Sequence, residues 1–237
     1  MPPRRPIEES RFVALCGEVF VRRDGFSQRW LDQRLAESGF ILKKVHLTEW
    51  IWYLDRQIRA GVLRPNLKAL GKVEMVVRRF YMPYSERRMK RLLAESGYYL
   101  NQRAAIDPLL DHGAHVISRE FIGEPCMTVG TGMLHAVDHL CGVINIGPFG
   151  CMPVRLTEAL LSPEMTIGAK RQARARLDPG YTLPAEFKDD MSIPFLTIET
   201  DGNPYPQVVE ARVEAFAVQA ERMYQLMRKH GTTQRER

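Results

Sequence analysis

The chain has 237 residues with an ordinary globular composition, 45% hydrophobic and 26% charged, which suits one large domain. No apolar run reaches the ~20 residues that span a bilayer, and the first six residues lack the apolar centre of a signal peptide, so we expect a cytoplasmic protein without a membrane span. The net charge of +6 comes largely from short arginine-rich runs, which are typical of solvated helix faces or of a patch for an acidic partner. Because no zinc-finger spacing or RNA-recognition motif accompanies them, nucleic acid is not the expected partner.

The N-terminal part of the chain predicts a strand, a helix and a second strand. Residues 12–20 form a nearly continuous apolar run, which is typical of a strand covered on both faces. Ser27 suits the N-cap of a helix that runs to Ser38, and Gly39 can end that helix in the left-handed conformation. The apolar residues of 41–47 then predict a second, short strand.

The middle of the chain predicts helices. Across 48–119, apolar residues recur at the spacing of one helix face, with basic residues between them. We therefore expect the whole chain, 1–237, to be one α/β domain in which this stretch is a helical insertion. The basic tail, from about 229 to 237, is expected to be frayed.

The last third predicts two more strand–turn–helix units. Residues 142–146 and 193–199 are short runs rich in β-branched and aromatic residues, each ending in a turn with glycine and proline, and an amphipathic helix begins near Pro206. Strands that alternate with helices favour a doubly wound parallel sheet. In such sheets, ligands bind at the carboxyl ends of the strands, where the connecting loops meet.

The turn after the third predicted strand carries the main candidate for chemistry. In 147–153 (GPFGCMP), two glycines flank a Pro-Phe pair and let the backbone pass close to a bulky group, and Cys151 follows where a helix would begin. A helix N-terminus favours the thiolate, the form of cysteine that ligates metal. The chain has four cysteines and no Cys-x-x-Cys pair. The residues alone therefore leave Cys151 open as a metal ligand, a reactive thiol or a buried structural cysteine.

Two acidic residues mark the end of the fourth predicted strand. Glu199 and Asp201 are two positions apart, so both can point toward the same crevice. They suit an acid–base pair or magnesium ligands. The segment 201–204 (DGNP) also has the composition of a plain turn, and we favour a turn that forms part of the site wall.

Two weaker candidates precede the third strand. His135 and His139 lie one helical turn apart with Cys141 nearby, which suits zinc, although we favour structural or surface histidines here. Residues 124–132 resemble a glycine-containing loop before a helix, which can contact phosphate, but they lack the lysine of a P-loop. Cys126, within that segment, is a secondary candidate for a metal ligand.

Longer segments around these turns resemble the activase-related proteins of the 2-hydroxyacyl-CoA dehydratase group. The resemblance is carried by 138–153 (DHLCGVINIGPFGCMP) and by 193–204 (IPFLTIETDGNP) with the residues that continue it to Phe216. The opening segment 13–19 (VALCGEV) resembles the start of the final region of those proteins. A fainter version of the first two blocks, in the same order, occurs in the dehydratase subunits. The resemblance covers both ends of the chain, and 48–110 contributes little.

The resemblance implies iron–sulfur chemistry in a flavodoxin-like fold. Dehydratase subunits hold a 4Fe–4S cluster through three cysteines of two tandem α/β domains, and an ASKHA-type ATPase activator injects the low-potential electron that reduces an acyl-CoA thioester to a ketyl radical. Cys151 matches the cluster ligand of the second of those domains. With Cys151 as the ligand, we expect the turn residues Gly147, Pro148, Phe149 and Gly150 to shape the cluster pocket, and Glu199 and Asp201 to line the same crevice.

The remaining ligands belong, in the family, to a preceding domain, which we do not expect within this chain. Because cysteines normally occupy four positions of a cluster, one thiolate would anchor it poorly. We therefore expect the chain, as a split-gene product or a fragment, to share its 4Fe–4S cluster with a partner subunit or domain, and to act on an acyl-CoA or another small molecule. Two alternatives stay open: a non-catalytic module that docks the activator ATPase, and a zinc-binding α/β domain around His135 and His139.

Overall fold

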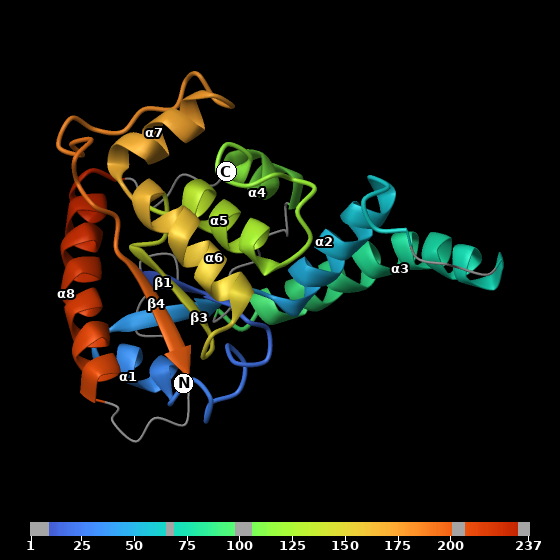
Figure 1. Ribbon diagram of the computed structural model, residues 1–237, viewed down its shortest axis with the longest axis horizontal. Helices are drawn as coiled ribbons and strands as arrows, with labels where there is room; N and C mark the ends of the chain where they lie inside the picture. The colour runs from blue at the N-terminus through green and yellow to red at the C-terminus, as the bar shows by residue number, and fades with distance from the viewer. Residues whose placement is uncertain (1–9, 65–68, 98–105, 201–206, 232–237) are drawn as a thin grey trace.

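The computed structural model describes four stretches of the chain, residues 10–64, 69–97, 106–200 and 207–231 (Figure 1). Four strands in these stretches form one sheet in the order β2-β1-β3-β4, and every pair of neighbours is parallel. The strands are β1 (Arg11–Gly17), β2 (Phe40–Lys44), β3 (Gly142–Pro148) and β4 (Phe195–Thr200).

Eight α-helices and one short 3-10 helix complete the described part of the chain. They are α1 (Leu31–Glu37), α2 (Leu47–Arg59), α3 (Ala69–Ala94), α4 (Ile106–Gly113), α5 (Glu124–His135), α6 (Met152–Leu161), η2 (Ser162–Glu164), α7 (Ile167–Ala175) and α8 (Gln207–Lys229). No described helix has the length and apolar character needed to cross a membrane. Of the expected frayed tail, residues 232–237 lie outside the described residues.

Helices cover both faces of the sheet. On one face α1 and α8 lie side by side, joined by an ion pair between Arg34 and Glu210 at 3.7 Å (Figure 1). On the other face α5 and α6 pack against β1 and β3, and the side-chain amide of Asn145 donates to the carbonyl of Val154 at 3.0 Å. This arrangement confirms the predicted doubly wound, flavodoxin-like parallel fold.

The core lies along the two central strands. The side chains of Val13, Leu15, Val143, Ile144 and Ile146 are completely buried between the two helical layers. A strand with helices on both faces has no solvent-facing side, so its sequence reads as a continuous apolar run rather than an alternating one. The apolar runs in the sequence predicted both strands for this reason.

The start of α1 differs from the prediction. The helix begins at Leu31 and not at Ser27, because the Asp24 carboxylate accepts the Ser27 amide at 2.7 Å and closes a local turn instead. Arg29 and Trp30 then adopt positive φ angles of 52° and 54°, which helices do not contain. The helix ends as predicted, with Gly39 at φ 81°.

The described part of the segment between β2 and β3 is mainly helical. Helices α2 and α3 extend away from the sheet side by side, whereas α4 packs on α5 within the layer that covers the sheet (Figure 1). The prediction of a glycine-containing loop at 124–132 is wrong, because these residues form most of α5. Pro125 suits the first turn of that helix, and Gly130 lies so close to α4 that a Cβ atom would come within 2.3 Å of the Leu109 carbonyl oxygen.

Candidate functional site

The carboxyl ends of β1, β3 and β4 meet at one edge of the sheet. Gly17 pairs with Ile146, and Pro148 pairs with Thr200, so the three strands end at nearly the same level. The amide of Phe149 then donates to the carbonyl of Thr200 at 3.1 Å. The turn after β3 is therefore held in place by β4, in the position where parallel sheets bind their ligands.

That turn presents Cys151 at the beginning of α6. Gly150 has φ 69°, a left-handed conformation that favours glycine, and the amide of Cys151 donates to the carbonyl of Pro148 at 3.1 Å. Cys151 is the N-cap residue of α6: its carbonyl accepts the first intrahelical bond from the Arg155 amide at 3.0 Å, while its side chain makes no capping bond. The half-buried thiol is thus free at the helix end where the backbone dipole is positive.

Two residues of β3 fix the position of α6. A Cβ atom on Gly147 would come within 2.4 Å of a methyl group of Val154, so only glycine permits the close approach of strand and helix. Asn145, which is completely buried, donates its side-chain amide to the Val154 carbonyl at 3.0 Å. Together these contacts set where the first turn of α6, and with it Cys151, lies above the sheet edge.

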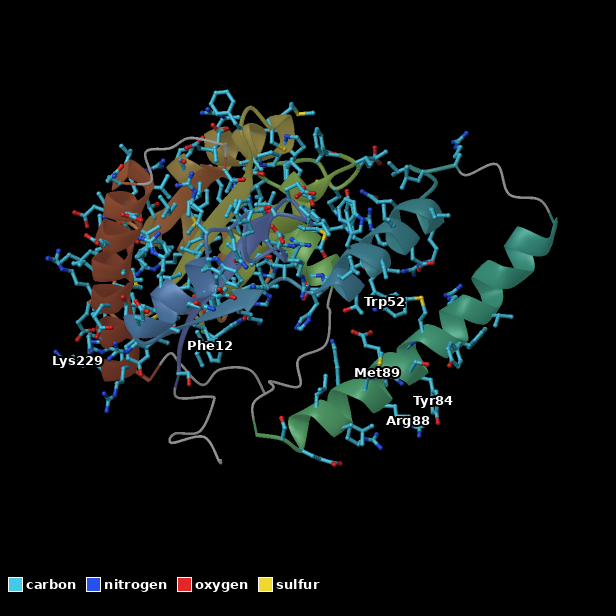
Figure 2. All side chains as sticks on the ribbon, turned by 90° about the horizontal axis from the view of Figure 1, so that it is seen from below. Phe12, Trp52, Tyr84, Arg88, Met89 and Lys229 are labelled. Atoms are coloured by element: carbon cyan, nitrogen blue, oxygen red, sulfur yellow. The ribbon has the colours of Figure 1, made fainter. Side chains whose placement is uncertain are left out.

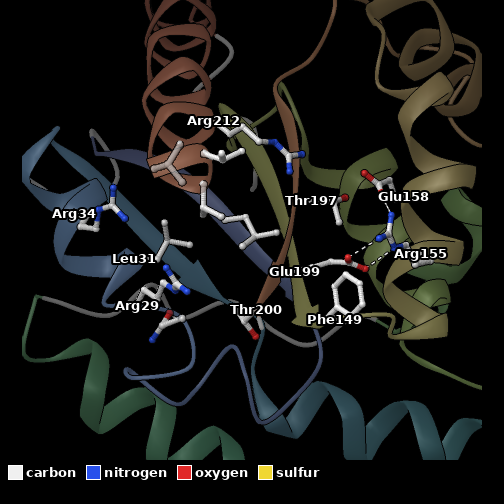
Figure 3. A pocket seen from close by; sticks show the side chains of 15 residues that line it. Arg29, Leu31, Arg34, Phe149, Arg155, Glu158, Thr197, Glu199, Thr200 and Arg212 are labelled. Carbon is white, nitrogen blue, oxygen red and sulfur yellow. Dashed lines mark hydrogen bonds and ion pairs between the residues drawn. The ribbon is translucent and has the colours of Figure 1, made fainter. Parts of the chain in front are cut away.

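The carboxylate of Glu199 is bound by an arginine of α6. The Arg155 guanidinium forms a two-pronged ion pair with it, Nε to one oxygen and Nη2 to the other, both at 2.5 Å (Figure 3). Glu158 lies 3.7 Å from the same guanidinium. Glu199 therefore connects β4 to α6 and is not a free base in this arrangement. Its predicted companion Asp201 lies outside the described residues.

A cavity of about 290 Å³ opens beside this ion pair, between α1, α6, α8 and the end of β4 (Figure 3). Of the residues predicted to surround a cluster, Phe149 and Glu199 line this cavity. Pro148 and Gly150 lie exposed on the turn, and Gly147 is buried beneath α6. The sulfur-bearing Cys151 is not part of the lining, so the cavity and the thiol are neighbouring features of one sheet edge.

Positive charge dominates the cavity wall. Arg29, Arg34, Arg155 and Arg212 line it, against the two carboxylates of Glu158 and Glu199 that are described there (Figure 3). Arg155 is occupied by the ion pairs described above, and Arg34 lies 3.7 Å from Glu210. Arg212 is exposed and forms no ion pair with a described residue. The cavity therefore suits an anionic group of a ligand.

The other three cysteines are structural in character. Cys16, Cys126 and Cys141 are each 1% exposed, and burial raises their pKa to about 12, about 11 and about 12. The Cys126 thiol donates to the carbonyl of Phe121 at 3.2 Å and that of Cys141 donates to the carbonyl of Phe12 at 3.0 Å. All three therefore stay protonated and hydrogen-bonded or buried, and nothing in this geometry favours Cys126 as a second ligand.

The two histidines proposed for zinc lie against each other. The rings of His135 and His139 have centroids 4.5 Å apart, and burial lowers the pKa of both, to about 3 for His139. The carboxylate of the adjacent Asp138 is bound by Lys170 at 3.0 Å and by the Tyr181 hydroxyl at 2.8 Å. Within the stretches that the structure describes, no three metal-binding side chains gather at one point. The two neutral, partly buried rings lie tilted against each other, so zinc binding by this pair stays an untested alternative.

Arg155, Asn145 and the cavity arginines are site residues that the sequence did not single out. Arg155 had one usable signal, because it follows Cys151 by four residues and so lies one helical turn further on the same face of α6. Asn145 also had a signal in the sequence, because it is the one strongly polar residue within an apolar strand. The arginines come from three separate elements, and only the fold brings them together.

Comparisons with known proteins found no match: no protein-family model, no curated protein and no solved structure matches the chain. The function therefore has to be argued from the fold and the site. For an iron–sulfur cluster the described donor set offers one accessible thiol, Cys151, with a cavity beside it. These residues fit one ligand of a cluster whose other ligands come from elsewhere, and they do not fit a complete cluster site within the described chain.

Proposed function

We propose that this protein contributes Cys151 as one ligand to a 4Fe–4S cluster that it shares with a partner subunit or domain, in a system related to the 2-hydroxyacyl-CoA dehydratases and their activase-related proteins. The observation that carries the proposal is the free, half-buried thiol at the N-cap of α6, on the carboxyl edge of the sheet. The resemblance of 138–153 and 193–204 to those families supports it from the sequence.

Each residue near the thiol has a definite part in the proposal. Cys151 binds iron, and Gly147 and Asn145 hold the helix that presents it. Arg155 and Glu199 fix the same helix to β4 through their ion pair. When bound, the cluster would supply one-electron transfer at low potential, driven by an ATPase activator.

The surface around Cys151 supports a shared site. Phe149 and Met152 flank the cysteine and are 69% and 65% exposed, and Phe20 extends from the adjacent loop after β1. Large apolar side chains grouped at a ligand-binding edge are typical of surfaces that a partner covers. A partner bound here would bring its own cysteines to the cluster and shield it from water.

The arginine-lined cavity supports an anionic substrate. The exposed Arg212 can pair with phosphate or carboxylate groups, and Arg29 and Arg34 add positive charge to the same wall. The cavity opens beside Phe149 and Glu199 at the same edge as Cys151. The phosphates of an acyl-CoA have this chemistry, as do smaller anionic substrates. We assign the cavity to the substrate and the neighbouring thiol to the cluster.

The test is anaerobic co-expression of the chain with a neighbouring gene product that carries the missing cysteines. Iron, acid-labile sulfide and the electron paramagnetic resonance signal of the reduced complex are then measured. We expect about four irons in the complex and far less than that in the isolated chain. Cys151→Ser is expected to lose the signal, whereas the matched control Cys16→Ala, a buried cysteine at the end of β1, is expected to keep it.

The outcomes separate the three candidate functions. Unchanged iron in the Cys151→Ser complex, or a full cluster in the isolated chain, would contradict the proposal. A stable complex without iron points to a module that only docks a partner. Zinc in aerobically purified protein that is lost in His135→Ala points to the zinc-binding alternative.

A further inference from the structure

Helix α3 lies apart from the body of the molecule. It runs beside α2 and extends beyond the sheet and its covering helices (Figures 1 and 2). Its inner side is held by Glu86, whose carboxylate accepts the Trp52 indole N–H at 2.8 Å and pairs with Lys90 at 2.7 Å. Lys90 is buried and Trp52 belongs to α2, so this side is the one that faces the protein.

The opposite side of α3 is unusually apolar for a solvent-facing helix. Val77, Phe80, Tyr81 and Tyr84 are each at least 60% exposed, with Phe80 at 74%. Their spacing of three and four residues places them on one face, about half a turn away from Glu86. Figure 2 shows Tyr84 and Arg88 on the side of the helix that is turned away from Trp52.

The same outward face changes character along its length. After Tyr84 it continues with Arg87, Arg88 and Arg91, which are all exposed and form no ion pair with a described residue. The first half of the face is therefore aromatic and the second half is cationic. Aromatic residues and arginine are the types enriched in the central part of protein interfaces, whereas lysine and glutamate are depleted there.

An antiparallel pair of such faces is complementary to itself. Suppose that two antiparallel helices cross with Tyr84 of one copy opposite Tyr84 of the other. A residue a given number of positions after Tyr84 in one copy then faces the residue the same number of positions before Tyr84 in the other. Arg88 then lies over Phe80 of the other copy, Arg87 over Tyr81, and Arg91 beside Val77. Arginine over an aromatic ring is a favourable cation–π contact, and this arrangement keeps the two cationic halves apart. A parallel pair would place arginine against arginine.

We propose that α3 is a self-association surface, through which two copies of the chain form an antiparallel, two-fold symmetric dimer centred on Tyr84. We infer a second copy of the chain as the partner, because the aromatic half of the face in one copy can bind the arginines of the cationic half in the other. The inference uses neither Cys151 nor a cluster, so it does not depend on the proposed function.

The geometry is tested by cysteine cross-linking of the full chain in a Cys151→Ser background, where the three remaining native cysteines are buried. Tyr84→Cys lies on the symmetry axis and is expected to form a disulfide-linked dimer on mild oxidation. Val77→Cys and Arg91→Cys are each expected to form no disulfide-linked dimer when oxidised alone, and to form one when the two variants are mixed. Efficient cross-linking of Val77→Cys with itself would indicate a parallel or unspecific contact and overturn the proposal.

The energetics are tested by sedimentation equilibrium of the unlabelled chain over a range of concentrations. We expect reversible dimerisation that Tyr84→Glu weakens at least about tenfold, because it places two carboxylates against each other on the axis. The matched control is Phe26→Ala, which removes an aromatic side chain that is 83% exposed in the loop after β1 and is expected to leave the dimer unchanged. A chain that stays monomeric at all concentrations, or a dimer that Tyr84→Glu leaves intact, would disprove the assignment of α3.

Discussion

At the scale of single residues, the four cysteines differ by how they are buried. Three are closed off from solvent, and desolvation keeps them as thiols with raised pKa values, whereas Cys151 has a partly accessible sulfur at a helix N-cap. Metal binding, alkylation and oxidation all start from the thiolate, so only an accessible cysteine can take part. Reactivity within this chain should therefore be concentrated at one position.

We predict that a single thiol of the native protein reacts rapidly with iodoacetamide at neutral pH. Peptide mass spectrometry should place the label on Cys151, and Cys16, Cys126 and Cys141 should react only after unfolding, because both their burial and their raised pKa oppose it. Cys151→Ser should abolish the fast phase, and Cys126→Ala should leave it unchanged. Fast labelling of two or more cysteines in folded protein would contradict the described burial.

The sequence could point to Cys151 but not to what surrounds it. A glycine–proline–phenylalanine turn before a cysteine is a local pattern, and local patterns survive in the fold. The ion pair of Arg155 with Glu199 and the gathering of Arg29, Arg34 and Arg212 depend on how separate elements pack, which no short stretch of sequence contains.

At the scale of elements, the contact between β3 and α6 controls where Cys151 lies. The two elements approach so closely at Gly147 that a methyl group there would overlap Val154. Overpacking of this kind forces a shift of the backbone or of the side chain it meets. A small change at Gly147 should therefore act on both stability and the position of the cysteine.

We predict that Gly147→Ala lowers the free energy of unfolding by about 1–3 kcal/mol, as measured by urea denaturation. Trimming the opposing side chain restores the space. The double variant Gly147→Ala/Val154→Ala should therefore lose less unfolding free energy than the two single variants lose together. Strict additivity of the two changes would show that the methyl group of Val154 is not what Gly147 accommodates.

Helix α3 contains a proline in its interior and still continues for three turns beyond it. Pro83 has no N–H to bond to the carbonyl of Arg79, and its ring crowds the preceding turn.

We predict that Pro83→Ala slows hydrogen exchange of the α3 amides, since alanine is about 3 kcal/mol more favourable than proline inside a helix. The amides of β1 and β3 should exchange as before, because α3 lies apart from the sheet. Slower exchange throughout the sheet would show that α3 and the body unfold together.

The limits of prediction at this scale have a physical cause. Elements buried on both faces, such as β1 and β3, carry a continuous apolar run and were predicted closely. The start of α1 was not, because it depends on the Ser27 amide that donates to the Asp24 carboxylate and on two residues other than glycine with positive φ, Arg29 and Trp30. Propensity opposes such conformations, and here local hydrogen bonds hold them, such as that from the Trp30 amide to the Gly25 carbonyl at 2.8 Å.

At the scale of the whole molecule, the strand order explains how distant segments form one site. The chain passes from β1 to β2 at the edge and then crosses over to β3 on the other side of β1, and the reversal brings the loops after β1 and β3 together. The amide of Glu18 donates to the carbonyl of Ile146 at 2.8 Å at this point. Such a reversal of strand order is where open parallel sheets bind ligands, and Cys151 lies directly beside it.

Partly buried histidines should make the folded molecule sensitive to acid. Burial lowers the pKa of His46 to about 4 and that of His139 to about 3, so both are neutral in the folded state across the range where an unfolded histidine takes up a proton. Below pH 6.5 the unfolded state therefore binds more protons than the folded state, and stability falls as the pH falls toward 4. Partial burial raises the pKa of Glu49 and of Glu124, which act in the opposite direction, so the histidine effect has to be isolated by a variant.

We predict that the free energy of unfolding, measured with urea between pH 7.5 and pH 4.5, falls with a slope that each such histidine steepens by up to about 1.4 kcal/mol per pH unit. His139→Gln removes one titrating group, so its slope should be shallower by about that amount below pH 6. The variant also loses the contact with the His135 ring, which changes its absolute free energy of unfolding. This change does not depend on pH while His135 is neutral, so the comparison uses the slopes. Parallel curves for the chain and the variant would mean that His139 takes up its proton as readily in the folded state as in the unfolded one, which its desolvation should prevent.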